Sequence, residues 1–329
     1  MNAPATDPYS IPLDKLDPSD GKLFQTQAHW EYFRRLRKED PVHFVESDAF
    51  GPYWSITRFE DIMYVDSHHD EFSSEPTIVI GDPGMDVLPP QFIAMDPPKH
   101  DVQRAAVSPA VAPKQLQEWE NLIRGRIQEV LDALPTGEAF NWVDKVSIEL
   151  TARMLATLFD IPQEDRRKLI YWSDAATSSA AVGMSGVTPE DRMAALEECL
   201  AYFTELWNQR VNAPPSMDFI SLMAHNPDTQ NMEPVEYLGN LILLIVGGND
   251  TTRNSMSGSV YALNKHPEQF AKLKADHSLI TSMVSETIRW QTPLGHMRRV
   301  ATQDVELGGK TIKAGDKVVM WYVSGNRDD

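Results

Sequence analysis

The sequence predicts a mainly α-helical protein with a small β region. From about residue 99 to residue 291, apolar residues recur at the three- and four-residue spacing of amphipathic helices. Short stretches at 42–57 and 298–323 alternate polar and apolar residues, which predicts strands. Within the helical part, the run that begins at Leu238 is too apolar to face water. We therefore expect helices around one central helix, with a small β region.

The N-terminal part combines an irregular segment with short helices and strands. Residues 1–27 predict an extended segment ahead of a single domain at 28–329. The expected elements are, in order, a helix at 28–39, a β-hairpin at 42–57 turned by Gly51-Pro52, a helix at 58–67 and a long proline-rich loop at 71–91.

The middle of the chain reads as a series of helices with clear stop signals. The first is expected after Pro97-Pro98, with Asp96 as its N-cap. Further helices are expected at 114–134, 142–160, 163–177, 188–212, 238–256 and 280–291, and a short one begins at Pro267. The segment 178–186 lacks helix signals and is expected to be softer. The helix at 114–134 has an apolar stripe made of Leu116, Trp119, Ile123, Ile127, Val130 and Leu131. Strands are expected at 298–301, 304–307, 310–313 and 317–323.

Composition excludes several classes of protein. The chain has 48 acidic against 30 basic residues and no basic run, which argues against nucleic-acid binding. One cysteine, Cys199, allows no disulfide within the chain and indicates a reducing compartment. The longest apolar run is far too short to span a membrane. We expect a cytoplasmic protein.

The central helix carries the strongest candidate site. Gly247 and Gly248 interrupt its apolar run, and Asp250, Thr251 and Thr252 follow at once. Glycines let a flat or small molecule approach a helix backbone closely, and an acid beside a hydroxyl can handle protons. A buried helix with a tight crossing at the glycines and Asp250 as an internal cap explains the residues equally well.

Two further candidates each allow two interpretations from the residues alone, and a third allows one. His100 and Arg104, four residues apart, suit a carboxylate ligand or a solvated helix face. Glu286 and Arg289, three apart, form either an exposed bridge or a buried charged network. Cys199 lies in a helix without glycines around it, which favours a packed thiol.

Together these motifs resemble the cytochrome P450 family of haem-thiolate monooxygenases. Gly247-Gly-Asn-Asp-Thr-Thr252 is similar to the family's oxygen-activation motif, and Glu286-Thr-Ile-Arg289 to its Glu-x-x-Arg pair. The segment from Asp96 to Arg104 is similar to a haem propionate-binding segment, and the segment from Arg299 to Gly309 is similar to the strand region with another propionate-binding arginine. The central motif and Leu294-Gly-His-Met-Arg-Arg-Val300 also resemble the bacterial branch that hydroxylates alkanes and fatty acids at the terminal carbon.

The resemblance implies a cofactor and a set of roles. Haem b would be held at its propionates by His100, Arg104 and Arg299, with Gly248 beside the dioxygen site. Asp250 and Thr251 would deliver protons, while Glu286 and Arg289 would hold the core. The expected substrate walls are the 71–91 loop, the 173–186 region, Leu244, Ile245 and Leu294. Electrons would come from NAD(P)H through a ferredoxin and a ferredoxin reductase, and the substrate would be a medium-chain alkane or fatty acid.

The sequence departs from the family in one respect. The family's haem ligand is a cysteine in a glycine-rich loop after the segment that resembles Asn326-Arg-Asp328, and no such loop is present. A thiolate ligand supplies the electron density that favours O–O cleavage. We therefore expect a form truncated before that loop, which would bind haem poorly and not hydroxylate. A peroxide-using relative and a haem-free helical fragment that binds hydrophobic ligands are the alternatives.

Overall fold

The computed structural model describes residues 7–82, 89–178 and 187–328. The chain forms two compact units. The sheet unit contains residues 7–82, 93–96 and 294–328, and the helical unit contains 89–92, 97–178 and 187–293. The single domain expected at 28–329 thus consists of two units, and segments from both ends of the chain build the first.

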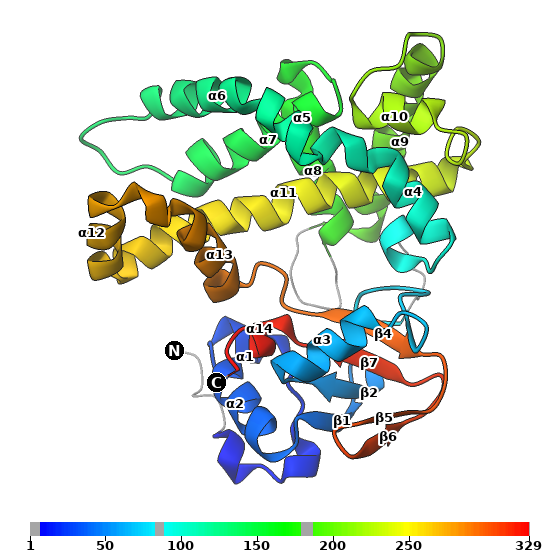
Figure 1. Ribbon diagram of the computed structural model, residues 1–329, viewed down its shortest axis with the longest axis vertical. Coiled ribbons are helices and arrows are strands. Elements are labelled where there is room, and N and C mark those ends of the chain that lie inside the picture. The colour runs from blue at the N-terminus through cyan, green and yellow to red at the C-terminus, as the bar shows by residue number, and fades with distance from the viewer. Residues whose placement is uncertain (1–6, 83–88, 179–186, 329) are drawn as a thin grey trace. The chain divides into compact units, whose positions relative to one another are not determined.

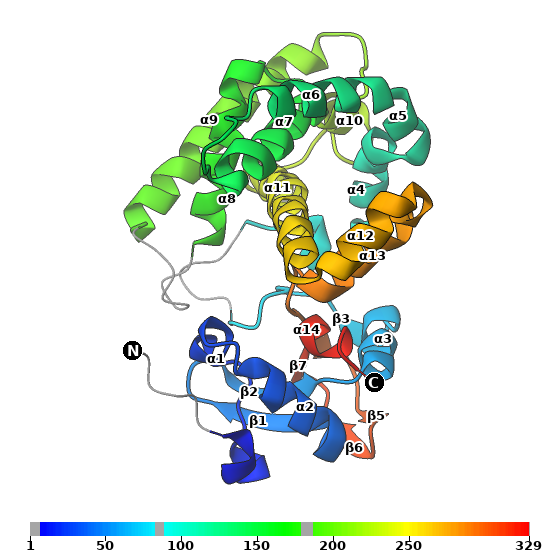
Figure 2. The same cartoon turned by 90° about the vertical axis from the view of Figure 1, so that its left-hand side faces the viewer.

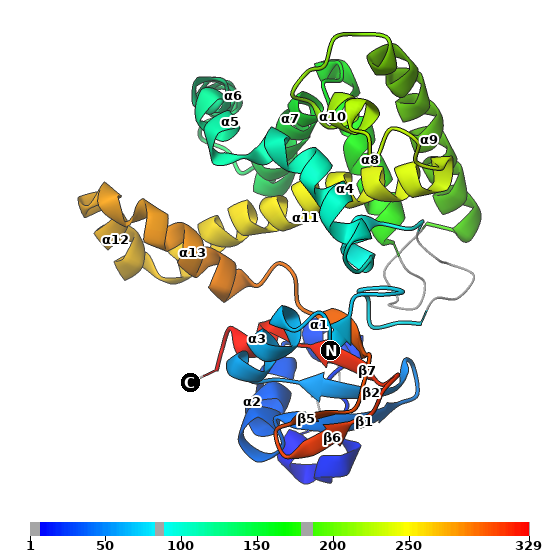
Figure 3. The same cartoon turned by 45° about the vertical axis from the view of Figure 1, so that its right-hand side comes forward.

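The sheet unit is organised by five strands in the order β1-β2-β7-β4-β3. They are β1 Val42–Ser47, β2 Gly51–Ile56, β7 Lys317–Met320, β4 Met297–Ala301 and β3 Phe72–Ser73. The β2–β7 pair is parallel and the other pairs are antiparallel. β5 Val305–Leu307 and β6 Lys310–Ile312 form a separate antiparallel ribbon (Figure 3). The strands expected near both ends of the chain are therefore present, and β2–β7 pairing joins them.

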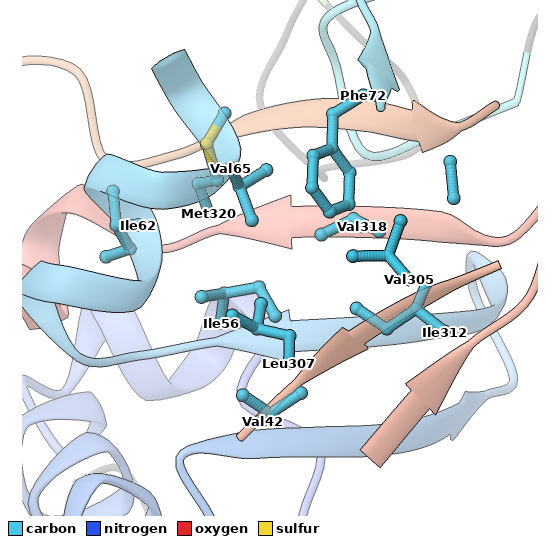
Figure 4. Packing of buried hydrophobic residues seen from close by; sticks show 11 residues of the cluster. Val42, Ile56, Ile62, Val65, Phe72, Val305, Leu307, Ile312, Val318 and Met320 are labelled. Carbon is cyan, nitrogen blue, oxygen red and sulfur yellow. The ribbon is translucent and has the colours of Figure 1, made fainter. Parts of the chain in front are cut away.

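One face of this sheet is closed by helix α3, Phe59–Ser67, and by the β5–β6 ribbon. Ile62 and Val65 of α3 are buried against apolar residues of the strands (Figure 4). The cluster comprises Val42, Ile56, Ile62, Val65, Phe72, Ala301, Val305, Leu307, Ile312, Val318 and Met320. Such burial is worth about 25 cal/mol per Å² of apolar surface removed from water, so this cluster stabilises the unit.

The N-terminal segment is folded, where the sequence predicted an extended chain. Two 3-10 turns, Pro8–Ser10 and Leu13–Lys15, precede α1, Gly21–Gln25, and α2, His29–Glu39. Leu16 and Leu23 are buried in a cluster with residues of α2. The few leucines of this mostly polar segment account for its packing. At the other end, α14, Tyr322–Gly325, replaces the last residues of the predicted strand.

The helical unit is arranged around α11, Pro234–Lys265, which has 32 residues (Figure 1). The other helices are α4 Lys99–Val107, α5 Pro113–Glu118, α6 Glu120–Asp132, α7 Glu149–Leu158, α8 Arg166–Thr177, α9 Pro189–Val211, α10 Phe219–His225, α12 Pro267–Ala275 and α13 Ile280–Gln291. A π-helical segment, Val143–Ile148, leads into α7. Among the described residues, no helix combines the length and apolar character needed to cross a membrane.

Several local predictions are confirmed and others are wrong. Thr188 and Asp191 form the expected capping box at the start of α9. Asp96 does not cap α4, because its carboxylate instead accepts the Ser74 N–H at 2.9 Å in the sheet unit. Helix α10 was not predicted, although Asp218 caps it by accepting the Ser221 N–H. The expected soft segment lies largely at 179–186, outside the described residues.

The apolar stripe predicted for 114–134 is mostly exposed. The segment is divided at Trp119 into α5 and α6, and of the stripe only Val130 is buried. Three apolar residues of α13 are also nearly half exposed, namely Ile280 at 47%, Val284 at 49% and Ile288 at 48%. Amphipathic spacing predicted these helices correctly, but it did not predict that their apolar faces would be uncovered.

Helices α7 and α8 are joined by one carboxylate that forms ion pairs with three arginines. Glu149, at the start of α7, accepts from Arg153 at 2.7 Å, from Arg166 at 2.9 Å and from Arg167 at 3.2 Å. Burial tends to raise the pKa of Glu149, but the hydrogen bonds from Arg153 and Arg166 outweigh burial and lower it. The ionised carboxylate therefore stabilises this helix pair at neutral pH, and the stabilisation is lost as pH falls through that lowered pKa.

Candidate active site on helix α11

Helix α11 is continuous through both glycines. The predicted interruption at Gly247 and Gly248 is therefore not a break in the helix, since all 32 residues keep helical geometry. Glycine weakens a helix by about 1 kcal/mol, and tertiary packing on α11 overcomes this preference. The two glycines differ in what surrounds them, and that difference defines the site.

Gly248 lies on the buried face of α11, against α7. A Cβ atom built at Gly248 would lie 2.6 Å from Cδ2 of Leu155. Ile245, one turn earlier on the same face, is 0% exposed. Figure 2, which views α11 nearly end-on, shows α7 and α8 beside it. Gly248 therefore permits close helix packing.

Asn249 forms hydrogen bonds that connect the buried face of α11 to α7 and α8. It is 0% exposed. Its Oδ1 accepts from Thr151 Oγ1 of α7 at 3.1 Å, and its Nδ2 donates to Ser173 Oγ of α8 at 3.1 Å. A buried amide that lacks partners costs about 1–3 kcal/mol, so both bonds favour a single rotation of α11 about its axis. The sequence analysis did not single out Asn249, although a buried polar residue inside an apolar helix was the available signal.

Gly247 is the glycine that faces open space. Nothing lies within 4 Å of a Cβ built there, and the residue is exposed. The hydroxyl of Thr251 donates to the carbonyl oxygen of Gly247 at 2.9 Å. Close approach to the α11 backbone is therefore available at Gly247. The dioxygen site beside Gly248, which the resemblance implies, stays a prediction.

Asp250 is held by a neighbouring arginine. Its side chain is 31% exposed and pairs with Arg253, one turn later on α11. Arg253 also reaches Asp174 of α8 at 3.4 Å. Asp250 is thus a partly exposed carboxylate with a fixed cation, adjacent in sequence to the hydroxyl of Thr251. The structure places this acid and alcohol next to the open glycine, and Arg253 is a contact that the sequence analysis missed.

His100 and Arg104 lie on α4 as their spacing predicted. His100 Nδ1 donates to the Phe92 carbonyl oxygen at 2.8 Å, and the Arg104 side chain is exposed. Arg299 is on β4 of the sheet unit, where it is 13% exposed and donates to Asp66 at 2.8 Å. The binding of haem propionates by these three residues remains a prediction.

The remaining predicted residues have varied surroundings. Leu244 is half-buried on α11, and Leu294 of the sheet unit is 39% exposed. Ile245 belongs to the core of the helical unit, so its predicted contact with substrate receives no support from its position. Glu286 and Arg289 form a two-bond ion pair with both distances 2.7 Å, on an exposed surface of α13. The hydrogen bond to Glu286 raises the pKa of Arg289.

The described residues include groups that can bind the propionates of haem, but no cysteine that fits as its thiolate ligand. His100, Arg104 and Arg299 can donate hydrogen bonds to carboxylates, and Gly247 leaves space for close approach. Cys199 does not fit as the thiolate ligand, because it is completely buried in α9 and burial raises the pKa of its thiol. The chain holds no other cysteine.

Comparison with known proteins identifies the family. The family model for cytochrome P450 matches residues 190–329. Linalool 8-monooxygenase of Pseudomonas putida is 34% identical over 96% of this chain and 80% of its own. The chain belongs to the cytochrome P450 family. Methyl-branched lipid omega-hydroxylase of Mycobacterium tuberculosis is 32% identical over 90% of this P450 and 72% of its own chain.

Comparison with solved structures supports the same family. The solved structure of CYP153D17 from Sphingomonas sp. PAMC 26605 has a TM-score of 0.88 and 49% identity, covering 95% of this chain and 79% of that one. The mainly helical architecture with its small sheets is thus the P450 fold, and the protein is a P450 monooxygenase. The family implies haem, dioxygen and electrons supplied by redox partners.

The two glycines of this P450 should respond oppositely to alanine. We expect Gly248→Ala to lower the free energy of unfolding by about 1 kcal/mol, because overpacking against Leu155 costs more than the gain in helix propensity. Gly247→Ala should raise it by up to about 1 kcal/mol, since its methyl group meets nothing. Urea denaturation of both variants measures the difference. Equal shifts in one direction would contradict this assignment of faces.

Proposed function

We propose that this P450, in a form that carries the family's cysteine loop, hydroxylates a medium-chain alkane or fatty acid at its terminal carbon. The observation that carries the proposal is the 32% identity, over nine tenths of the chain, to an enzyme named as a lipid omega-hydroxylase. The motifs at 247–256 and 294–300 support the same branch by their resemblance to terminal hydroxylases. An apolar chain without a polar handle would be bound through burial of its surface.

His100, Arg104 and Arg299 are the residues proposed to hold the cofactor. Bound haem supplies the iron chemistry that activates dioxygen. His100 donates from Nδ1 to the Phe92 carbonyl oxygen, which leaves Nε2 to meet a propionate, and there it must carry a proton to donate. Arg104 and Arg299 add fixed positive charge, and Arg299 would exchange its bond to Asp66 for the propionate.

Asp250 and Thr251 are proposed to move protons to the reacting oxygen. Arg253 keeps Asp250 close to the helix, and the Thr251 hydroxyl donates to the Gly247 carbonyl oxygen. To relay a proton, the Thr251 hydroxyl would take one from an acid or water through a lone pair. It would release its own proton to the reacting oxygen, turning away from the Gly247 carbonyl oxygen. This arrangement supports a relay that ends at the open face of α11, with Gly247 giving room for the oxygen.

The electron supply is proposed to be a ferredoxin with its NAD(P)H-dependent reductase. The chain belongs to the cytochrome P450 family, whose members receive electrons from redox partners. Separate electron-transfer proteins would then deliver electrons one at a time. Catalysis with peroxide alone is less consistent with the site, because peroxide already carries the protons that Asp250 and Thr251 would supply.

The product profile tests the proposed reaction. Enzyme that carries the family's cysteine loop is loaded with haem and incubated with a ferredoxin, its reductase and n-alkanes, fatty acids or linalool, and products are identified by mass spectrometry. We expect terminal alcohols of alkanes or fatty acids. Products formed only from linalool would favour a terpenoid hydroxylase, as the 34% identical relative is named. Alkane binding with no Soret band on haem titration would instead support a haem-free ligand-binding protein.

Replacing Thr251 should uncouple electron consumption from hydroxylation. In Thr251→Ala the relay loses its hydroxyl, so more hydrogen peroxide and less alcohol should form per NAD(P)H consumed. Thr252→Ala is the matched control, because this neighbouring threonine is exposed and has no role in the proposed relay. The measurement is the ratio of alcohol to NAD(P)H. An unchanged ratio in Thr251→Ala would remove Thr251 from the relay.

A further inference from the structure

We propose that Asn240 of α11 is a positioning residue that sets the orientation and tautomer of His100 through the Phe92 peptide group. The consequence for cofactor binding rests on the proposed role of His100. The positioning itself is a property of the protein alone. All the residues concerned lie in the helical unit.

Asn240 is a buried amide whose partners fix its orientation. It is 1% exposed. Its Oδ1 accepts the Phe92 N–H at 2.9 Å, and its Nδ2 donates to Gln103 Oε1 at 2.9 Å and approaches Met232 Sδ at 3.2 Å. Reversing the amide would place an NH₂ group against the Phe92 N–H, so only one orientation satisfies these partners.

Phe92 transmits this orientation to His100. Its N–H binds Asn240, and its carbonyl oxygen accepts from His100 Nδ1 at 2.8 Å. The two rings also meet edge to face, with centroids 6.1 Å apart. A carbonyl oxygen can only accept, so Nδ1 of His100 carries a hydrogen and Nε2 is the nitrogen left for another ligand. Nε2 is an acceptor in the neutral ring and a donor to a propionate only in the protonated ring.

Gly239 brings the Phe92 segment onto α11. A Cβ built at Gly239 would lie 1.9 Å from the carbonyl oxygen of Pro90, so the backbone there rests directly on the helix. On the α4 side, Gln103 donates to Glu236 at 2.5 Å, and Lys99 pairs with Glu236 at 2.8 Å. His100 is thus held in a closed circuit that runs from α11 through Phe92 to α4 and back through Gln103.

Replacement of Asn240 should allow the neutral His100 ring to adopt either tautomer. Without the Oδ1 acceptor, the buried Phe92 N–H must find another partner. The Phe92 segment then shifts, and its carbonyl oxygen moves away from Nδ1. The imidazole would no longer be restricted to the Nδ1–H form, and Nε2 would no longer be presented consistently.

The test is ¹⁵N NMR of histidine side chains in the haem-free 329-residue chain at mildly alkaline pH. The His100 signals are assigned by comparison with His100→Gln. We expect the Nδ1–H tautomer in the wild type, a shift toward Nε2–H in Asn240→Leu, and retention of Nδ1–H in Asn240→Asp, which keeps the acceptor. A wild-type His100 in the Nε2–H form overturns the proposal without any variant having to fold.

The control separates positioning from general loss of stability. Asn249→Leu also removes a buried amide from α11, but its partners are Thr151 and Ser173, on α7 and α8. It should leave the His100 signals in place. Equal shifts in Asn240→Leu and Asn249→Leu, or no shift in Asn240→Leu, would contradict the proposal. Because the readout needs no haem, its failure is distinct from a failure of the proposed function.

Discussion

The two hydrogen bonds of Asn249 are the constraint on which the described arrangement of the helical unit depends. One amide joins α11 to α7 and α8, and its burial makes both bonds costly to lose. A helix turns by about 100° per residue, so fixing Asn249 fixes every neighbouring side chain. Gly248 then packs on Leu155, while Gly247 faces open space and Asp250 and Thr251 flank that opening.

Helix α11 uses the same dipeptide, Gly-Asn, at two sites. Gly239-Asn240 lies against the 90–92 segment and α4, and Gly248-Asn249 lies against α7 and α8. In each pair the glycine allows close approach and the asparagine supplies the hydrogen bonds. The two pairs are nine residues apart, which corresponds to about two and a half helical turns. They therefore lie on opposite sides of the helix. Each side thereby receives a packed contact.

Sequence patterns predicted most of the elements because those patterns are local. Helical spacing, proline stops and the Thr188–Asp191 capping box each involve residues within a few positions of one another. The folded N-terminal segment was missed because Leu16 and Leu23 gain their burial from α2. The exposed stripe on α6 was missed for the converse reason, since spacing shows which residues share a face and not whether anything covers it.

The candidate site was predictable as a motif but not in its orientation. Two adjacent glycines followed by an acid and a hydroxyl marked the place. Which glycine faces the opening depends on Thr151 and Ser173, which are distant in sequence. A double-mutant cycle with Asn249→Ala and Ser173→Ala tests this constraint most directly by unfolding free energies. We predict a coupling on the order of 1 kcal/mol, and strictly additive effects would contradict the account.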